Sequence, residues 1–139
     1  MALPENRWIQ RFDNYKKVLQ HLEIFVSEKS NNSQTNTEEF AIIKAFELTF
    51  ECAWNLMKDF LNSKGINDII GSRDTIRSAF RNEIIEDGEI WFDMIKRRNN
   101  TAHVYDGEIA TEISLIVANE YINEFRKLKE KFEKFKSKV

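Results

Sequence analysis

The sequence is poor in the residues that make cross-links, tight turns and membrane spans. Of its 139 residues, one is cysteine, one is proline and four are glycine. One cysteine excludes a disulfide framework and a zinc cluster, and Cys52 lies in an apolar run, where we expect a buried structural thiol. No apolar run approaches the roughly 18 residues of a membrane-spanning helix. The scarcity of proline and glycine favours long helices in a globular protein.

Acidic and basic residues nearly balance, which excludes a strongly basic nucleic-acid-binding protein. The chain has 21 lysines and arginines, 23 aspartates and glutamates, and a formal net charge of −2. Without an overall positive field, any contact with RNA must be local. Residues 1–5 lack a signal-like basic and apolar region. We therefore expect one cytoplasmic domain over residues 1–139, with no membrane partner.

In the N-terminal half, apolar residues recur every three or four positions, which is the period of an amphipathic helix. A first helix is predicted over residues 5–28, followed by a polar loop over residues 29–37. Thr35 and Glu38 have the spacing of a capping box that starts a second helix, which Gly65 ends. Because that helix has a single polar stripe, other helices should cover most of it. The stripe includes Lys44, Glu47, Glu51 and Asn55.

Asp-Gly pairs at positions 87–88 and 106–107 divide the C-terminal half of the chain. Before the first pair, Ser72 is the predicted N-cap of a short helix that reaches residue 85, with Ile76, Ala79 and Phe80 facing inward. Between the two pairs lies a predicted fourth helix from about residue 89.

After the second pair, a last helix is predicted from about residue 108 to the C-terminus. Its apolar residues alternate steps of four and three and must pack against a neighbour. They are Tyr121, Phe125, Leu128, Phe132, Phe135 and Val139. No strand pattern occurs, so the predicted fold is all-α, an antiparallel bundle of four to five helices.

The fourth helix carries four polar groups that a packed core does not need, namely Arg98, Asn99, His103 and Tyr105. At roughly 100° per residue, Arg98 and Tyr105 fall on the apolar face that contains Trp91. An arginine there can lie between subunits, pair with a buried acid or hold a ligand anion. Arg98 and His103 point about 140° apart, so they converge only if the helix ends nearby or a second copy contributes one of them.

The pairing of an arginine with a histidine suits cleavage of RNA without a metal. The histidine would move a proton to or from a ribose oxygen, and the arginine would stabilise charge on the pentacoordinate phosphate. One histidine cannot easily be both base and acid, and a symmetric dimer would supply a second proton-transfer group. No carboxylate pair with ligand spacing stands beside the cluster, so we expect no metal and no cofactor.

Further basic residues recur near the cluster. Arg73, Arg77 and Arg81 are spaced every four residues along the predicted third helix, and Lys96 and Arg97 precede Arg98. Such rows are either a surface for RNA phosphates or a partner, or simply a solvated helix face.

Arg98-Asn99 followed by His103 resembles the R-polar-x(4–6)-H signature of the HEPN superfamily, all-helical proteins of prokaryotic conflict and RNA-processing systems. The resemblance extends over residues 45–51 (AFELTFE), 54–61 (WNLMKDFL), 77–80 (RSAF), 87–91 (DGEIW) and 98–106. Together these segments resemble the nucleotidyltransferase substrate-binding family and cover most of the chain from Glu39 onward.

This resemblance implies a HepT-like homodimer that forms a hetero-oligomer with a minimal, MntA-like nucleotidyltransferase. In pairs of this type the helical protein is an RNase toxin, and its partner adds AMP to the tyrosine of an R-x4-H-x-Y motif. Arg98 and His103 match the catalytic pair, Asn99 the polar position after the arginine, and Tyr105 the modified tyrosine.

Two alternatives to a toxin remain open. The protein can be a non-catalytic module that presents a substrate or a nucleotide to the nucleotidyltransferase, as the family's name implies. It can also be a helical scaffold whose motif is inert.

Overall fold

The structure is a computed structural model that describes residues 6–29, 36–101 and 106–139, which are helical apart from short connections. The elements are α1 (Arg7–Glu28), α2 (Asn36–Ser63), α3 (Gly71–Arg81), α4 (Gly88–Asn100), α5 (Gly107–Ile116), η3 (Val117–Tyr121) and α6 (Ile122–Ser137). No strand occurs within these ranges, and the predicted all-α class is confirmed. None of the described helices combines the length and apolar content that crossing a membrane requires.

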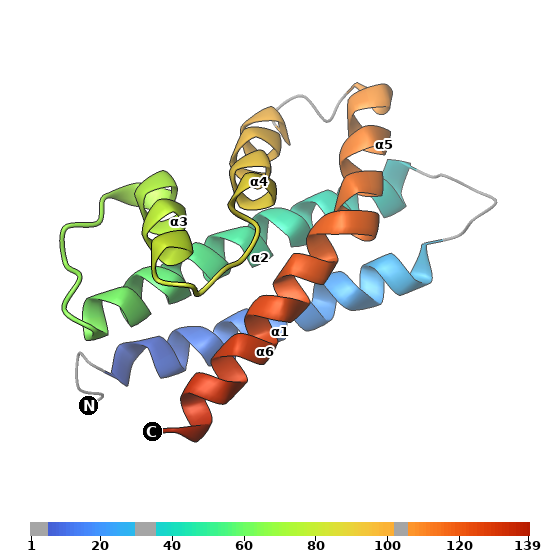
Figure 1. Cartoon of the computed structure of the whole chain (residues 1–139). Helices are drawn as coiled ribbons and strands as arrows, with labels where there is room; N and C mark the ends of the chain where they lie inside the picture. Colours follow the sequence, from blue (N-terminus) through green and yellow to red (C-terminus); the bar gives the residue numbers. More distant parts are fainter. Residues whose placement is uncertain (1–5, 30–35, 102–105) are drawn as a thin grey trace.

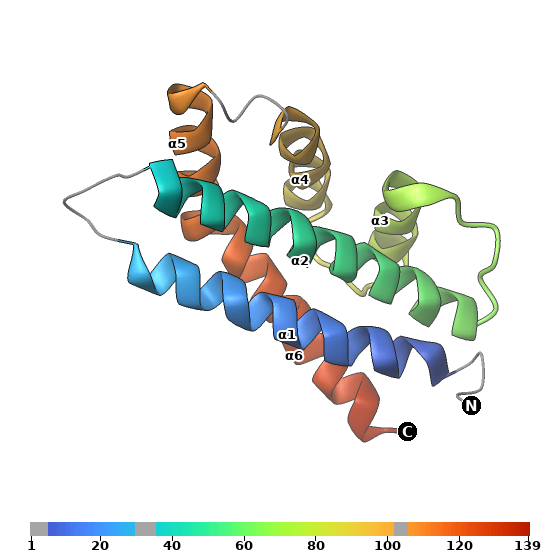
Figure 2. The same ribbon diagram turned by 180° about the vertical axis from the view of Figure 1, so that it is seen from behind.

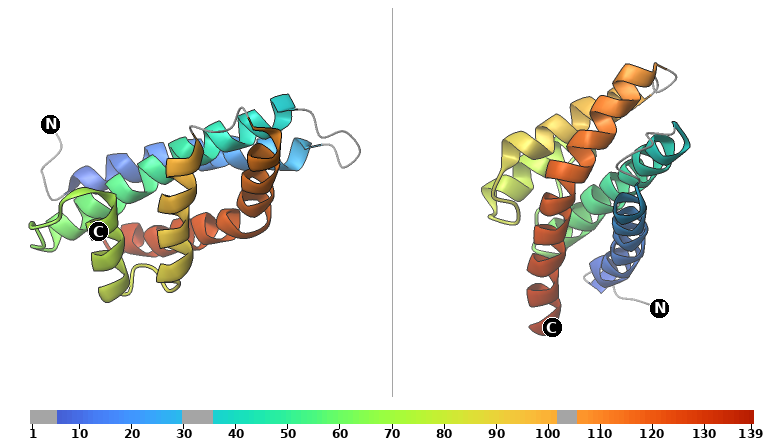
Figure 3. Two further views of the ribbon diagram at one scale, coloured as in Figure 1. Left: turned by 90° about the horizontal axis from the view of Figure 1, so that it is seen from above. Right: turned by 90° about the vertical axis from the view of Figure 1, so that its right-hand side faces the viewer.

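The helices form two layers. α1 and α2 lie side by side and antiparallel, and the continuous run from α5 through η3 to α6 crosses them on one side (Figure 1). Seen from behind, α1 and α2 lie in front of the middle of that run, and α5 extends beyond α2 (Figure 2). α3 and α4 stand beside it in the same layer (Figure 3). α2 contacts α1, α3, α5 and η3, so its predicted central position is confirmed.

The predicted amphipathic faces of α1 and α2 form the core between the layers. Trp8, Phe12, Tyr15, Leu19 and Leu22 of α1 are buried, in register with the period of the helix. On α2 the cover is incomplete, because Phe40 and Leu48 are 42% and 48% exposed. The helix ends at Ser63, and Gly65 is the predicted stop just after it, with a φ of 89° that glycine adopts without strain.

α3 differs from the prediction at both ends. It begins at Gly71, and the carboxylate of Asp74 accepts the Ile70 N–H at 3.3 Å, so Ser72 lies inside the first turn and is not the N-cap. It ends at Arg81 because Glu83 takes a left-handed φ of 60° and the Ile84 N–H bonds the Ala79 carbonyl at 2.9 Å. That ending is a Schellman turn without glycine.

The predicted inward face of α3 is only partly correct. Ile76 and Ala79 are fully buried, whereas Phe80 is 50% exposed. Phe80 covers Gly88, where an added Cβ would lie 3.3 Å from its ring. The side chain thus packs on the backbone at the start of α4 and leaves one face in solvent.

α4 also ends earlier than predicted. Asp87 caps its start by accepting the Ile90 N–H at 3.2 Å, but the helix stops at Asn100 with Thr101 as C-cap. The hydroxyl of Thr101 donates to the Arg98 carbonyl at 2.7 Å, which satisfies one carbonyl of the last turn. The expectation that Arg98 and Tyr105 share one continuous helix involves residues 102–105, which lie outside the described ranges.

The C-terminal segment is one helical run with a single irregularity. Between α5 and α6 the backbone widens into one π-helical turn, η3, which the apolar spacing did not predict. The aromatic stripe is buried from Tyr121 through Phe125 to Phe132, but Val139 is 75% exposed. The Phe125 ring lies 5.6 Å from that of Trp91, so the stripe fixes α6 against α4.

Candidate functional site

The site is built around the C-terminal end of α4, which carries Arg98. Trp91, Met94 and Ile95 anchor the helix in the core. Arg97 and Arg98 make the last turn basic, which suits the negative end of a helix dipole. Beyond these anchors the helix leaves the core, so the side chain of Arg98 is 43% exposed. The sequence placed Arg98 within an apolar stripe, but in the structure it stands at the exposed end of that stripe.

Arg98 is tethered to the middle of α2. Its Nη2 donates to Oε2 of Glu51 at 2.8 Å, and the side chains are 43% and 42% exposed. Within the described ranges this is the one polar contact of the Arg98 side chain. A guanidinium carries five N–H donors in a planar fork, so four of them, including the second N–H of Nη2, remain available to an anion. The sequence allowed Arg98 to lie between subunits, to pair with a buried acid or to hold a ligand anion. The structure shows that it pairs with an acid, Glu51, and that this acid is exposed.

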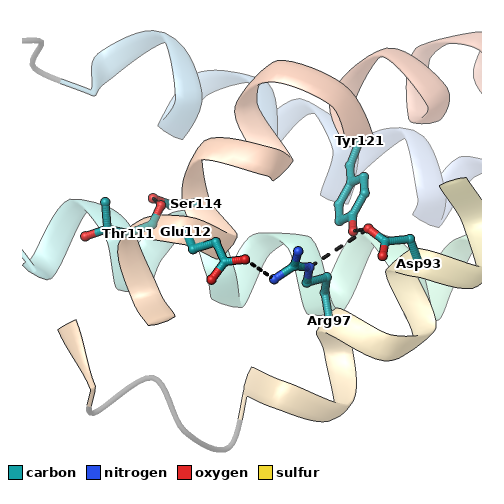
Figure 4. Close-up of polar contacts among 6 residues, drawn as sticks. All are labelled: Asp93, Arg97, Thr111, Glu112, Ser114 and Tyr121. Atoms are coloured by element: carbon teal, nitrogen blue, oxygen red, sulfur yellow. Dashed lines mark hydrogen bonds and ion pairs between the residues drawn. The ribbon is translucent and has the colours of Figure 1, made fainter. Parts of the chain in front are cut away.

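A second polar cluster fixes the neighbouring turn of α4 against α5 and η3 (Figure 4). Arg97 Nη1 donates to Glu112 at 2.6 Å, and its Nε lies 3.9 Å from an Asp93 oxygen. The hydroxyl of Tyr121, on the π turn, donates to the same carboxylate of Asp93. We name these four residues, Asp93, Arg97, Glu112 and Tyr121, the α4–α5 clamp.

Burial and bonding in the clamp set its protonation. Burial, followed by the hydrogen bond to Asp93, raises the pKa of Tyr121 well above its ordinary value, so the phenol stays neutral. The hydrogen bond to Glu112 raises the pKa of Arg97, which stays charged. Arg97 is only 23% exposed and faces α5. It therefore connects α4 to α5 through Glu112.

The start of α5 is tied to α2 by a buried carboxylate. Glu39 is 1% exposed. Its two carboxylate oxygens lie 3.0 and 3.1 Å from the Thr111 hydroxyl, which donates to the carboxylate. One turn later the hydroxyl of Ser114 receives a hydrogen bond from Lys29 at 3.4 Å. Figure 4 shows Thr111 and Ser114 on α5, apart from the clamp. These contacts hold α5 in place next to the end of α4.

The remaining predicted site residues are distributed as follows. Asn99 and Lys96 are exposed on α4 next to Arg98. His103 and Tyr105 lie outside the described residues, so the structure does not place them relative to Arg98. The other histidine of the chain, His21, is exposed on α1, far along the sequence from this site. Cys52 is free and half-buried, and burial raises the pKa of its thiol, which fits a structural role.

The arginine row of α3 forms an exposed face. Arg73 lies over the ring of Phe92 on α4, 5.7 Å from its centroid. Arg77 pairs with Asp74 at 3.0 Å, one helical turn away. Arg81 is exposed at the end of the helix. We name Arg73, Arg77 and Arg81 the α3 arginine face.

No group of three or more His, Cys, Asp or Glu residues within the described ranges is arranged to hold a metal ion. The site that the structure does describe consists of one guanidinium, one carboxylate and exposed amide and lysine side chains. Such a set can bind an anion and accept a proton.

Sequence reasoning missed three residues of this region. Glu51 was grouped with the polar stripe of α2, and nothing in its spacing pointed to Arg98, 47 positions away. Asp93 and Tyr121 are 28 positions apart, and their contact depends on the π turn. The one available signal was a tyrosine hydroxyl on an otherwise apolar stripe, since a buried hydroxyl needs a partner.

A comparison with protein families matches residues 10–134 to the family described as nucleotidyltransferase substrate binding protein like. The matched range contains both α2 with Glu51 and α4 with Arg98. A search of curated proteins found no match.

Proposed function

Because the chain belongs to the family of nucleotidyltransferase substrate-binding-like proteins, we propose that it is the helical subunit of a two-component system with a nucleotidyltransferase. Its own activity in this proposal is cleavage of RNA without a metal. The observation that supports this most directly is the Arg98 guanidinium. It is held at a helix end by one hydrogen bond to Glu51, while its other donors make no hydrogen bond with a described residue. A phosphodiester offers the oxygens that such a fork binds in pairs.

In the proposed reaction, Arg98 binds the scissile phosphate and stabilises its developing charge. His103 transfers a proton at a ribose oxygen, and Asn99 contributes a neighbouring amide. The α3 arginine face and Lys96 supply the local positive surface that a chain of net charge −2 needs for RNA. A homodimer would place two such sites together.

We further propose that the nucleotidyltransferase silences this activity by adding AMP to Tyr105. The tyrosine is two positions from His103 and seven from Arg98. The added phosphate would be attracted to the guanidinium, and the adenosine would occupy space that RNA needs.

The direct test uses unmodified protein, purified without its partner, and a broad panel of tRNAs and mRNAs in a buffer with a chelator. We expect cleavage by the wild type, and loss of cleavage in Arg98→Ala and His103→Ala variants that fold normally. Arg126→Ala is the matched control. Arg126 pairs with Glu23 at 2.9 Å at similar exposure, so its loss removes the same kind of surface ion pair elsewhere. Intact RNA at a molar excess of protein would contradict the proposal.

One feature favours a second candidate, a subunit that binds a nucleotide without cutting RNA. A cavity of about 260 Å³ lies between α6 and the turn that follows α3. Ile84, Ile85 and Leu128 are among its apolar lining residues, and Lys131 is among its charged ones. Calorimetry with ATP and AMP on the protein and on its complex with the nucleotidyltransferase tests this. Absence of affinity in both samples would count against it.

A further inference from the structure

Cleavage of RNA by its own 2′-hydroxyl needs two proton-transfer groups. A base removes the hydroxyl proton as the oxygen attacks phosphorus, and an acid protonates the departing 5′ oxygen. The sequence motif offers one histidine, which cannot serve in both roles in the same step. The structure shows a second candidate next to Arg98, and it comes from a different helix.

Glu51 is the only carboxylate that contacts Arg98 among the described residues. Its Oε2 accepts from Nη2 at 2.8 Å, while its Oε1 has no hydrogen-bond partner within those residues. The side chain is 42% exposed, so the carboxylate is open to an incoming ligand. One helical turn earlier, Glu47 instead pairs with Lys44, at 3.7 Å.

The guanidinium fixes where a bound phosphate would lie relative to this carboxylate. Its donors are coplanar, so a phosphate bound through the free donors shares the plane and the neighbourhood of the Glu51 oxygens. The ribose whose 2′-oxygen attacks is attached to that phosphate. A carboxylate that contacts the same guanidinium is therefore within reach of the 2′-hydroxyl.

We propose that Glu51 is the general base of the RNA cleavage, an inference that rests on the proposed RNase function. Glu51 takes the 2′-hydroxyl proton, the 2′ oxygen forms a bond to phosphorus, and the bond from phosphorus to the 5′ oxygen breaks. The acid, which the proposed function assigns to His103, donates its proton to that 5′ oxygen. The products are a 2′,3′-cyclic phosphate and a 5′-hydroxyl, and Glu51 then releases its proton to water. With Glu51 as the base, each site needs one histidine rather than two.

Glu51→Gln tests the assignment, because the amide keeps the shape and the contact to Arg98 but cannot accept the proton. We expect RNA cleavage to fall about 10²- to 10⁴-fold. Binding of a non-cleavable 2′-deoxy-substituted RNA, measured by fluorescence anisotropy, should stay equal or become tighter, since a competing anion is removed. Glu51→Asp should recover part of the rate. Glu23→Gln, which alters the matched ion pair with Arg126, should leave cleavage unchanged.

The dependence of the cleavage rate on pH separates a base from a residue that only orients Arg98. The wild-type rate should fall toward acidic pH as the base becomes protonated, and Glu51→Gln should lack this fall. The titratable and charged groups beside Glu51 are Arg98 on α4 and Glu47 and Cys52 on α2. A guanidinium does not titrate in the working range of an enzyme, burial raises the pKa of the Cys52 thiol, and Glu47→Gln accounts for the other carboxylate.

Each outcome decides the matter. Loss of rate together with loss of the acidic fall supports the proposal. A Glu51→Gln variant that cleaves at the wild-type rate, or more slowly with the acidic fall intact, overturns the base assignment and leaves the RNase function standing. If the wild-type protein cleaves no RNA, the proposed function itself fails, and the role of Glu51 fails with it.

Discussion

Arg98 and Glu51 are 47 positions apart in the sequence, yet Nη2 of the arginine lies 2.8 Å from Oε2 of the glutamate. The contact joins the end of α4 to the middle of α2. Both side chains are about two-fifths exposed, and pairs of this kind contribute at most about 1 kcal/mol to stability. The main consequence of the pair is therefore the position of the guanidinium.

Replacing Arg98 by lysine tests whether the planar fork matters. Arg98→Lys keeps the charge but removes paired binding of phosphate oxygens. We expect RNA cleavage to fall about 10²- to 10³-fold, while the free energy of unfolding changes by less than about 1 kcal/mol. Cleavage assays and urea denaturation measure the two effects, with Arg126→Lys as control. A wild-type rate in Arg98→Lys would show that charge alone suffices.

The regulatory role of Tyr105 is tested by intact mass after co-expression with the nucleotidyltransferase. The wild-type protein should gain one or more AMP units and lose RNA cleavage. Tyr105→Phe has no hydroxyl to modify and should keep its original mass and stay active in the presence of the partner. An AMP adduct that persists in Tyr105→Phe would place the modification on another residue.

The α3 arginine face should contribute binding rather than chemistry. Arg73→Ala, Arg77→Ala and Arg81→Ala combined should weaken binding of RNA across sequences and reduce its salt dependence, because each lost phosphate contact lowers the slope of log affinity against log salt by about 0.7–0.9. A variant that combines Lys129→Ala and Lys134→Ala on α6 with Lys138→Ala at its C-cap removes equal charge and serves as control. If affinity for RNA is equal in both variants and the wild type, α3 is a solvated face or a protein contact.

Tyr121→Phe breaks the α4–α5 clamp. The lost hydrogen bond to Asp93 should cost about 1–2 kcal/mol of unfolding free energy at neutral pH, measured by urea denaturation. RNA cleavage should also fall, because the clamp holds the turn of α4 that precedes Arg98. A variant as stable as the wild type would show that the hydroxyl is equally well satisfied by water.

The same tyrosine makes stability depend on alkaline pH. Its pKa in the folded protein is raised above the ordinary value of 10.0, by burial first and then by Asp93. Below pH 10 the phenol is neutral in both states, so its contribution is constant. Above it, the unfolded phenol loses a proton that the folded one keeps, so the free energy of unfolding falls as pH rises. Tyr121→Phe should make that fall shallower. Tyr15→Phe should act in the same direction, since burial also raises the pKa of Tyr15.

Much of the fold follows from local pattern. The spacing of apolar residues predicts α1 and α2 closely, because a helix that packs on one face repeats its buried side chains every three or four positions. Glycine at position 65 marks the end of α2. The end of α3 escaped the same reasoning, because Glu83 adopts the left-handed conformation that glycine usually supplies. The π turn at Val117–Tyr121 has no comparable signature in the sequence.

The sequence alone determined the helical class and most residues of the core, and it supplied the candidate residues Arg98, Asn99, His103 and Tyr105, since these depend on composition, period and motif. Only the tertiary structure decided that Arg98 is exposed and paired with Glu51, that Arg97 turns inward to Glu112, and that Tyr121 bonds Asp93. The physical reason is the separation along the sequence over which each feature is decided. Helix formation and facial burial are set within a turn or two of the chain, whereas each of these contacts depends on how two helices distant in sequence cross and where each one ends.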